Sequence, residues 1–268
     1  MGGHSPAACE HRPGPHARSR SVLRAGDPQA VTVELIVAVI AVAAAASWIQ
    51  AVAGSGFGVI AGPLLMTLQP ELMPGILLLV SPPVFAIALW QDRLGLRSLD
   101  LVLPSLLGVV GALAALPLLP RLDVFWLSLA VGATVTAAAS AALAGLRVPQ
   151  RQWVLALAGT MGGALSTLAA APGPPLLVVY NRSEPQRYRA NLSLFFLVAC
   201  TVSLVVLVLA GRLEAPSALG ALWLVPGIAI GMIAAAPLRG RLPGTAVRKA
   251  GLWIALLAGA LLLTRTVL

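Results

Sequence analysis

The chain has 268 residues, of which 59% are hydrophobic and only 10% are charged, and its formal net charge is +9. Soluble domains are about 45–50% apolar and about 25% charged, so this composition excludes an ordinary soluble domain and predicts a polytopic membrane protein. The arginines gather in the N-terminal tail and in short loops, as topology signals do, so we expect no nucleic-acid partner.

The N-terminal 30 residues are rich in Pro, Gly, Ser, His and Arg. This composition predicts a disordered basic tail over residues 1–30. A cleaved signal peptide fits poorly, because the apolar run that follows is too long for a signal core and merges with a membrane span. A genuine tail and an over-extended start over the first 28 residues both remain open.

Apolar runs then follow one another to the C-terminus. A run of about 20 residues crosses the hydrocarbon core of a bilayer. The full-length candidates are 31–50, 72–90, 99–119, 124–146, 152–170, 190–210, 216–238 and 247–266. Two shorter runs, Phe57 to Leu68 and Pro174 to Tyr180, each follow a glycine- or proline-rich break. The fold class is therefore an all-α polytopic membrane protein with 8–10 transmembrane segments.

The chain also repeats itself. PLLPRL at Pro117 to Leu122 matches PLRGRL at Pro237 to Leu242, 120 residues later. AGSGFGVIAGPLL, which starts at Ala53, and AAPGPPLLVV, which starts at Ala170, occupy equivalent places at an offset near 116. These matches predict a first transmembrane repeat over 31–146 and a second over 152–266.

Basic residues predict how the repeats are oriented. The loops at 91–98, 147–151, 181–189 and 239–249 carry two, two, three and four Lys or Arg, whereas the intervening loops carry one or none. The richer loops face the cytoplasm by the positive-inside rule, and they alternate correctly only if residues 174–180 cross the membrane or nearly do. The repeats are then inverted, as in many secondary transporters. A basic tail on the cytoplasmic side would instead make the first short segment re-entrant and reduce ten crossings to nine.

The two breaks are the candidate site. Non-helical backbone in a membrane is tolerated only where protein covers it or it lines a cavity. Pro174 and Pro175 suit the first turn of a new half-helix after Gly173, and free N–H groups at a helix start attract anions. In the other half, four residues form the matching turn: Gly54, Ser55, Gly56 and Gly58. The alternative is that these glycines only permit close helix packing.

Further polar residues complete this hypothesis. Asn191 is a candidate lining residue, and buried hydroxyls such as Ser81, Ser166 and Thr167 are donors or simple helix back-bonders. Arg182, Arg187 and Arg189 form one basic group that marks the cytoplasmic face or attracts anions towards it. No metal site or cofactor is expected.

The motifs resemble a known family. AGSGFGVIAGPLL and STLAAAPGPPLLVVY, with RYRANLSLFFLV after the second, are similar to the glycine- and proline-rich signatures of the sulfite exporter TauE/SafE family of membrane transporters. The resemblance covers essentially all of 31–266, although Phe57, Ala170, Ala171 and Pro172 stand where the family commonly has more glycine. It implies a plasma-membrane permease, multi-pass, that moves sulfite, a sulfonate or another oxidised-sulfur anion, most simply outward.

Two other function classes were weighed. The AGSGFG turn is similar to the serine turn of intramembrane proteases, but the three histidines all lie in the tail, so Ser55 has no base in a span and we expect no enzyme. A non-transporting membrane subunit or assembly partner is the alternative function. The expected partners are the lipid bilayer and a small anion, with a homo-oligomer left open.

Overall fold

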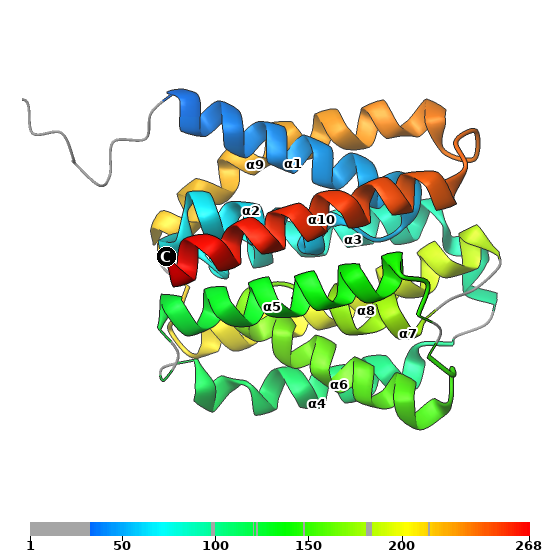
Figure 1. The fold of residues 1–268 in the computed structure, drawn as a ribbon, viewed down its shortest axis with the longest axis horizontal. Helices are drawn as coiled ribbons and strands as arrows, with labels where there is room; N and C mark the ends of the chain where they lie inside the picture. Colours follow the sequence, from blue (N-terminus) through cyan, green and yellow to red (C-terminus); the bar gives the residue numbers. More distant parts are fainter. Residues whose placement is uncertain are drawn as a thin grey trace, which may run out of the picture. The chain divides into compact units, whose positions relative to one another are not determined.

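The computed structural model describes residues 33–97, 100–119, 121, 123–146, 148–180, 184–213 and 215–268. The predicted tail at 1–30 lies outside them. Over the described residues the secondary structure is helical throughout (Figure 1). The α-helices are α1 (Val33–Ala53), α2 (Phe57–Leu68), α3 (Gly75–Gln91), α4 (Val102–Ala114), α5 (Val124–Leu143), α6 (Gln152–Ala169), α7 (Gly173–Val179), α8 (Pro185–Leu209), α9 (Ala215–Ala235) and α10 (Gly244–Val267).

The helices have the length and surface of membrane spans. Among the described residues, five helical stretches are long and apolar enough to cross a bilayer: α1, α5, α8, α10 and Pro216–Leu238, which contains most of α9. Large apolar side chains such as Leu106, Trp153, Ile233 and Leu257 are exposed on the outside of the bundle, where lipid rather than water is their favourable solvent. The predicted all-α polytopic membrane protein is confirmed.

Both halves of the chain contain the same series of elements. The short helix α2 follows α1, and the short helix α7 follows α6. Helix α1 ends at Ala53 and α6 at Ala169, which is the predicted offset of 116. The two PL-containing motifs form equivalent 3₁₀ turns, Leu116–Leu118 and Ala236–Leu238, at the offset of 120. The local sequence repeat therefore produces a local structural repeat.

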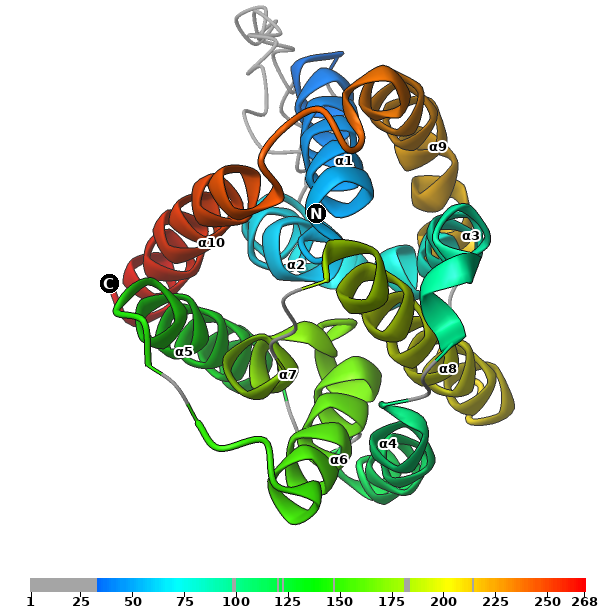
Figure 2. The ribbon, with the colours of Figure 1, turned by 90° about the vertical axis from the view of Figure 1, so that its right-hand side faces the viewer.

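The helix contacts are also related by exchange of the two halves. Helix α1 packs on α9, as its counterpart α6 packs on α4. Helices α3 and α8 pair with each other, and so do α5 and α10. The short helices lie inside this ring: α2 packs on α10 and α7 on α5 (Figure 2). The halves thus interlock within one compact unit, residues 33–268, and the division into repeats at 31–146 and 152–266 stays a prediction.

The pairing of α5 with α10 shows that the halves are inverted. Gly132 of α5 faces Leu263 of α10, and Gly259, one turn earlier in α10, faces Thr136, one turn later in α5. The two equivalent helices therefore run antiparallel. Equivalent helices that run antiparallel are expected when two halves are related by the pseudo-two-fold axis of inverted-topology repeats.

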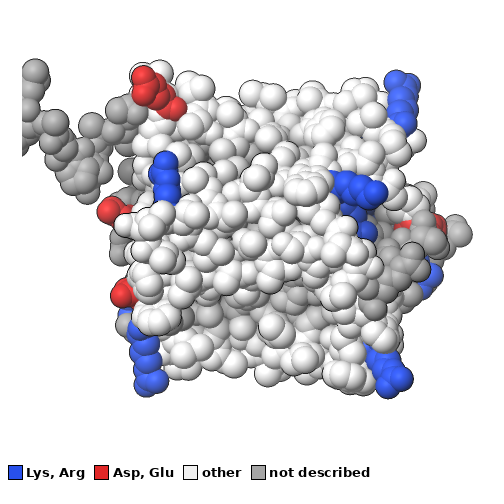
Figure 3. Space-filling model, viewed as in Figure 1, with Lys and Arg blue, Asp and Glu red and all other residues white. Residues whose placement is uncertain are grey.

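Charge separates the two ends of this bundle. Most visible Lys and Arg lie at the right-hand end in Figure 3, and most visible Asp and Glu at the left-hand end. We call the right-hand end, formed by the loops after α3, α5, α7 and α9, the basic end (Figure 1). Helix α1 begins at the opposite end. This agrees with the prediction of ten crossings, in which both short segments cross the membrane.

Candidate functional site

The first break follows α1 at Gly54. Its φ of +77° lies in the left-handed region, which L side chains rarely adopt. A Cβ on Gly54 would also contact the side chain of Arg189 and lie 2.8 Å from Arg189 Cα. Glycine is required here by backbone conformation and by the close approach of α8.

The second break has the same backbone geometry with a different residue. Ala170 stands 116 positions after Gly54 and is left-handed as well, with a φ of 54°. The N–H of Ala170 donates to Ser166 O at 2.8 Å, and the N–H of Ala171 donates to Leu165 O at 3.3 Å, which ends α6. Pro174 then stands in the first turn of α7, as the sequence predicts.

The two breaks meet in the middle of the bundle. A Cβ on Gly58 would lie 2.9 Å from Ala170 O, and a Cβ on Gly173 would lie 2.6 Å from Val59 Cγ2. All four of these residues are buried. The structure therefore brings the two predicted motifs together, and it shows that their glycines serve close packing whether or not they bind an anion.

The start of α2 supplies a polar group that the sequence-based prediction missed. Gln50, in the last turn of α1, is 1% exposed, and its Oε1 accepts a hydrogen bond of 3.2 Å from Phe57 N–H. Its Nε2 is buried and has no partner among the described residues. Ser55 stands in the same turn and is 6% exposed. A glutamine inside an apolar run was the available signal, because polar residues are rare there and commonly functional.

The start of α7 offers fewer donors than expected. Proline has no N–H, so neither Pro174 nor Pro175 can donate to an anion from the first turn of α7. In the first turn of α2, by contrast, Gly58 has an N–H, while the N–H of Phe57 donates to Gln50 Oε1 and leaves Gln50 Nε2 as the unused donor. The donors of the candidate site come mainly from the first break, while the second break supplies its shape.

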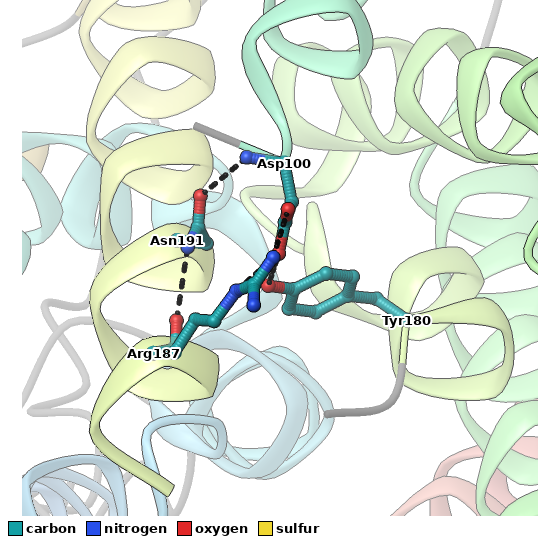
Figure 4. A network of polar contacts seen from close by, with 4 residues as sticks. All are labelled: Asp100, Tyr180, Arg187 and Asn191. Atoms are coloured by element: carbon teal, nitrogen blue, oxygen red, sulfur yellow. Dashed lines mark hydrogen bonds and ion pairs between the residues drawn. The ribbon is translucent and has the colours of Figure 1, made fainter. Parts of the chain in front are cut away.

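Asn191 is held in a network at the basic end (Figure 4). Its Oδ1 accepts from Asp100 N–H at 3.1 Å, and its Nδ2 donates to Arg187 O at 3.0 Å. Asp100 in turn accepts two hydrogen bonds from Arg187, at 2.7 and 2.9 Å, and one of 2.9 Å from the hydroxyl of Tyr180. Asn191 thus positions the loop before α4, and a role in binding stays a prediction.

Arg189 belongs to a second, more buried charge cluster. Its Nε and Nη2 donate to the two carboxylate oxygens of Asp92 at 3.0 and 2.9 Å, and Arg239 Nη2 also donates to Asp92. The side chains of Asp92, Arg189 and Arg239 are 4%, 14% and 15% exposed. Burial lowers the pKa of Arg239, and the neighbouring Arg189 lowers it further, while Asp92 raises it. One carboxylate serves two guanidinium groups, so the cluster keeps one excess positive charge.

Comparison with known proteins identifies the chain. Residues 39–262 match the model of the family described as sulfite exporter TauE/SafE. The chain belongs to this family. It is therefore a multi-pass membrane transporter. Separate searches among curated proteins and among solved structures each found no significant match.

Several hydroxyl groups are buried inside this TauE/SafE transporter. Thr167 Oγ1 donates to Ala112 O at 3.1 Å and lies 2.9 Å from Ser203 Oγ, and Ser166 Oγ donates to Cys200 Sγ at 3.7 Å. Ser166 and Thr167 therefore have partners within the bundle. Within the described ranges, no three His, Cys, Asp or Glu side chains gather where a metal could bind. Arg182 lies outside those ranges.

Proposed function

We propose that this transporter moves sulfite, a sulfonate or another small oxidised-sulfur anion outward, through the zone where the two breaks meet. The main support is that Gly58 of the first break packs on the second break, and Gly173 of the second break packs on α2. The region is buried and contains the donors of Gln50 and Ser55. Backbone N–H groups and neutral donors bind an anion without a buried positive charge. Such a site suits a carrier that must release its substrate.

The charge at the basic end supports the direction. A loop set this rich in Arg and Lys is cytoplasmic by the positive-inside rule, and its positive field raises the local concentration of anions. An interior-negative potential of 100 mV contributes about 2.3 kcal/mol per charge, which sustains roughly a fifty-fold outward gradient of a monovalent anion. We therefore propose export driven by the membrane potential.

This driving force has a direct test. In proteoliposomes, a potential set by potassium and valinomycin should drive anion flux, and setting it to zero should leave only flux down the concentration gradient. Flux that is unchanged at zero potential but follows an imposed pH gradient would contradict the proposal. The sequence places all three histidines within residues 1–16, so a histidine proton relay in the bundle is not part of this account.

The symmetry of the fold supports a simple transport cycle. The breaks are buried, so an anion can reach them only after helices separate on one side. Exchange of the roles of the two inverted halves would open the opposite side, as in alternating access. We propose that the α2 and α7 half-helices separate from each other on one side at a time.

The experiment for the proposed function is transport in proteoliposomes. Labelled sulfite, thiosulfate, sulfate and a short sulfonate are offered to the wild type, to Ser55→Ala and to Ser105→Ala. Ser105 is the matched control, because its hydroxyl donates to Leu101 O at 2.6 Å within α4. We expect the wild type to carry at least one sulfur anion and only Ser55→Ala to slow it, by up to about tenfold for one lost hydrogen bond.

Two outcomes would oppose the proposal. Equal flux in Ser55→Ala and wild type would remove Ser55 from the site. Failure of folded wild-type protein to carry any of the four anions would contradict the assigned substrates, and a stoichiometric co-purifying membrane protein would then favour the subunit alternative.

A further inference from the structure

Two side chains in contact near the basic end, Arg248 and Tyr188, each have a buried hydrogen-bond donor. Arg248 is in the second turn of α10, and its Nη2 donates to Leu177 O at 3.1 Å. Its Nε is buried and has no partner in the described part of the chain. The hydroxyl of Tyr188, a residue of α8 that is 5% exposed, is likewise buried and unpartnered where the structure describes the chain. The guanidinium carbon of Arg248 lies 5.2 Å from the centre of the Tyr188 ring.

Comparison with two neighbouring arginines indicates what these donors fit. Arg187 uses Nε and Nη2 to hold the carboxylate of Asp100, and Arg189 uses the same two atoms to hold that of Asp92. Arg248 has no carboxylate among its contacts with described residues. Nε and Nη2 form the edge of a guanidinium that binds two oxygens of a planar or tetrahedral oxyanion. Arg248 therefore has the same edge without a carboxylate from the described residues, and its Nη2 donates to the Leu177 carbonyl instead.

Capping of a helix explains only part of this arrangement. Leu177 is in the last turn of α7, where carbonyl groups lack helical partners and cations are favourable. The bond from Nη2 satisfies that carbonyl. It leaves the buried Nε and the Tyr188 hydroxyl without acceptors, and buried donors without acceptors cost free energy. An oxyanion has enough acceptor oxygens to satisfy both donors.

The position of the pair connects it with the site at the breaks. Helix α7 begins at Gly173, in the second break, and ends at Val179. Seven residues of helix span only about 10 Å. An anion held at Arg248 is thus one short helix away from the zone where the breaks meet. Arg248 itself is half-buried rather than closed off from the basic end.

We infer that Arg248 and Tyr188 form an anion-binding site at the basic end, which takes the substrate oxyanion before it reaches the breaks. The guanidinium supplies the charge and the Nε–H, the phenol supplies an O–H, and the anion supplies two acceptor oxygens. The inference rests on the proposed function for the class of anion. The site itself is defined by the two donors.

Three variants test this inference. Arg248→Gln removes the charge and the Nε–H, and Tyr188→Phe removes the hydroxyl while it keeps the ring that stacks on Tyr180 at 5.7 Å. Lys249→Gln is the matched control, because it removes a neighbouring exposed charge of the same helix. Sulfite binding to the purified protein is measured by titration calorimetry, and sulfite flux from the basic end is measured against concentration in oriented liposomes. Thermal unfolding of each variant shows that it is folded.

We expect Arg248→Gln to weaken sulfite binding and raise the half-saturating concentration by about tenfold or more, since a charge-assisted hydrogen bond is lost. Tyr188→Phe should raise the dissociation constant for sulfite and the half-saturating concentration by roughly fivefold each, as for a lost neutral hydrogen bond. Lys249→Gln should match the wild type.

The outcomes separate this inference from the proposed function. If the wild type transports sulfite and both folded variants bind and transport it unchanged, the site at Arg248 is wrong and export stands. If sulfite binds to the wild type, is lost in both variants and is transported by none, the binding site stands and the proposed function fails. Wild-type protein that binds no sulfite at millimolar concentration would overturn the inference outright.

Discussion

The two breaks share a backbone path but not a chemistry. Gly54 and Ala170 are both left-handed at equivalent positions, but Gly54 lies against Arg189 of α8, whereas the carbonyl oxygen of Ala170 lies against Gly58 of α2. The first break has Gln50, which accepts from the Phe57 N–H at the start of α2, while the second has prolines, which lack an N–H. Inverted symmetry thus fixes where the chain bends, and in the proposed function the first bend supplies donors to the anion while the second bend shapes its path.

The largest expected effect concerns the charges that support each break. Asp92 holds Arg189, which packs on Gly54, and Asp100 holds Arg187 near the end of α7. Asp92→Ala leaves buried guanidinium groups unpaired and should lower the free energy of unfolding by about 3–5 kcal/mol. Asp100→Ala should cost clearly less, because the Arg187 side chain is 33% exposed and solvent screens it. Denaturation in mixed micelles measures both, and equal losses would contradict the ranking.

The next largest change in stability distinguishes Gly54 from Ala170, the left-handed residues of the two breaks. Gly54→Ala adds left-handed strain and a contact with α8, which together should destabilise the protein by about 2–5 kcal/mol. Gly211→Ala is the control: its φ is +64° and nothing lies within 4 Å of the added Cβ, so only the strain of about 1–2 kcal/mol applies. Ala170→Gly should be within about 1 kcal/mol of wild type, because relieved strain offsets the entropy gained on unfolding. A Gly54→Ala protein as stable as Gly211→Ala would show that α8 does not press on the first break.

A smaller effect tests whether the breaks touch. Gly173→Ala should cost about 1–3 kcal/mol, because its Cβ meets Val59 Cγ2. Val59→Ala should relieve that contact, so that the double variant loses less stability than the sum of the single variants, by at least about 0.5 kcal/mol. Gly58→Ala is the comparison, since its Cβ meets the backbone oxygen of Ala170 and truncating Val59 should not rescue it. Strict additivity for Gly173→Ala and Val59→Ala would argue against contact between the breaks.

The sequence predicts the parts of this structure that depend on local chemistry. Clustered glycines and prolines interrupt helices at Gly54–Gly56 and at Pro172–Pro175, whereas single prolines such as Pro63 and Pro226 lie inside helices. The breaks, the half-helix starts and the repeat offsets were therefore predictable. The Asp92–Arg189 pair was not, because its partners are 97 positions apart and only the packing of α3 on α8 brings them together. The Arg248–Tyr188 pair was missed for the same reason, whereas Gln50 had a local signal, a glutamine inside an apolar run, that the prediction did not use. Both pairs depend on contacts between segments that are far apart in the sequence.

The central claim is that donors of the first break hold the anion, and one comparison tests it most directly. Gln50→Leu is set against Ser166→Ala, since Ser166 stands 116 positions later, at the equivalent place in the second half. Each folded variant is measured for initial sulfite flux in proteoliposomes at a fixed interior-negative potential. We predict that Gln50→Leu slows flux by about tenfold to a hundredfold, as for a lost buried donor, and that Ser166→Ala stays within about twofold of wild type. Equal flux in the two variants, or a larger loss in Ser166→Ala, would contradict the claim.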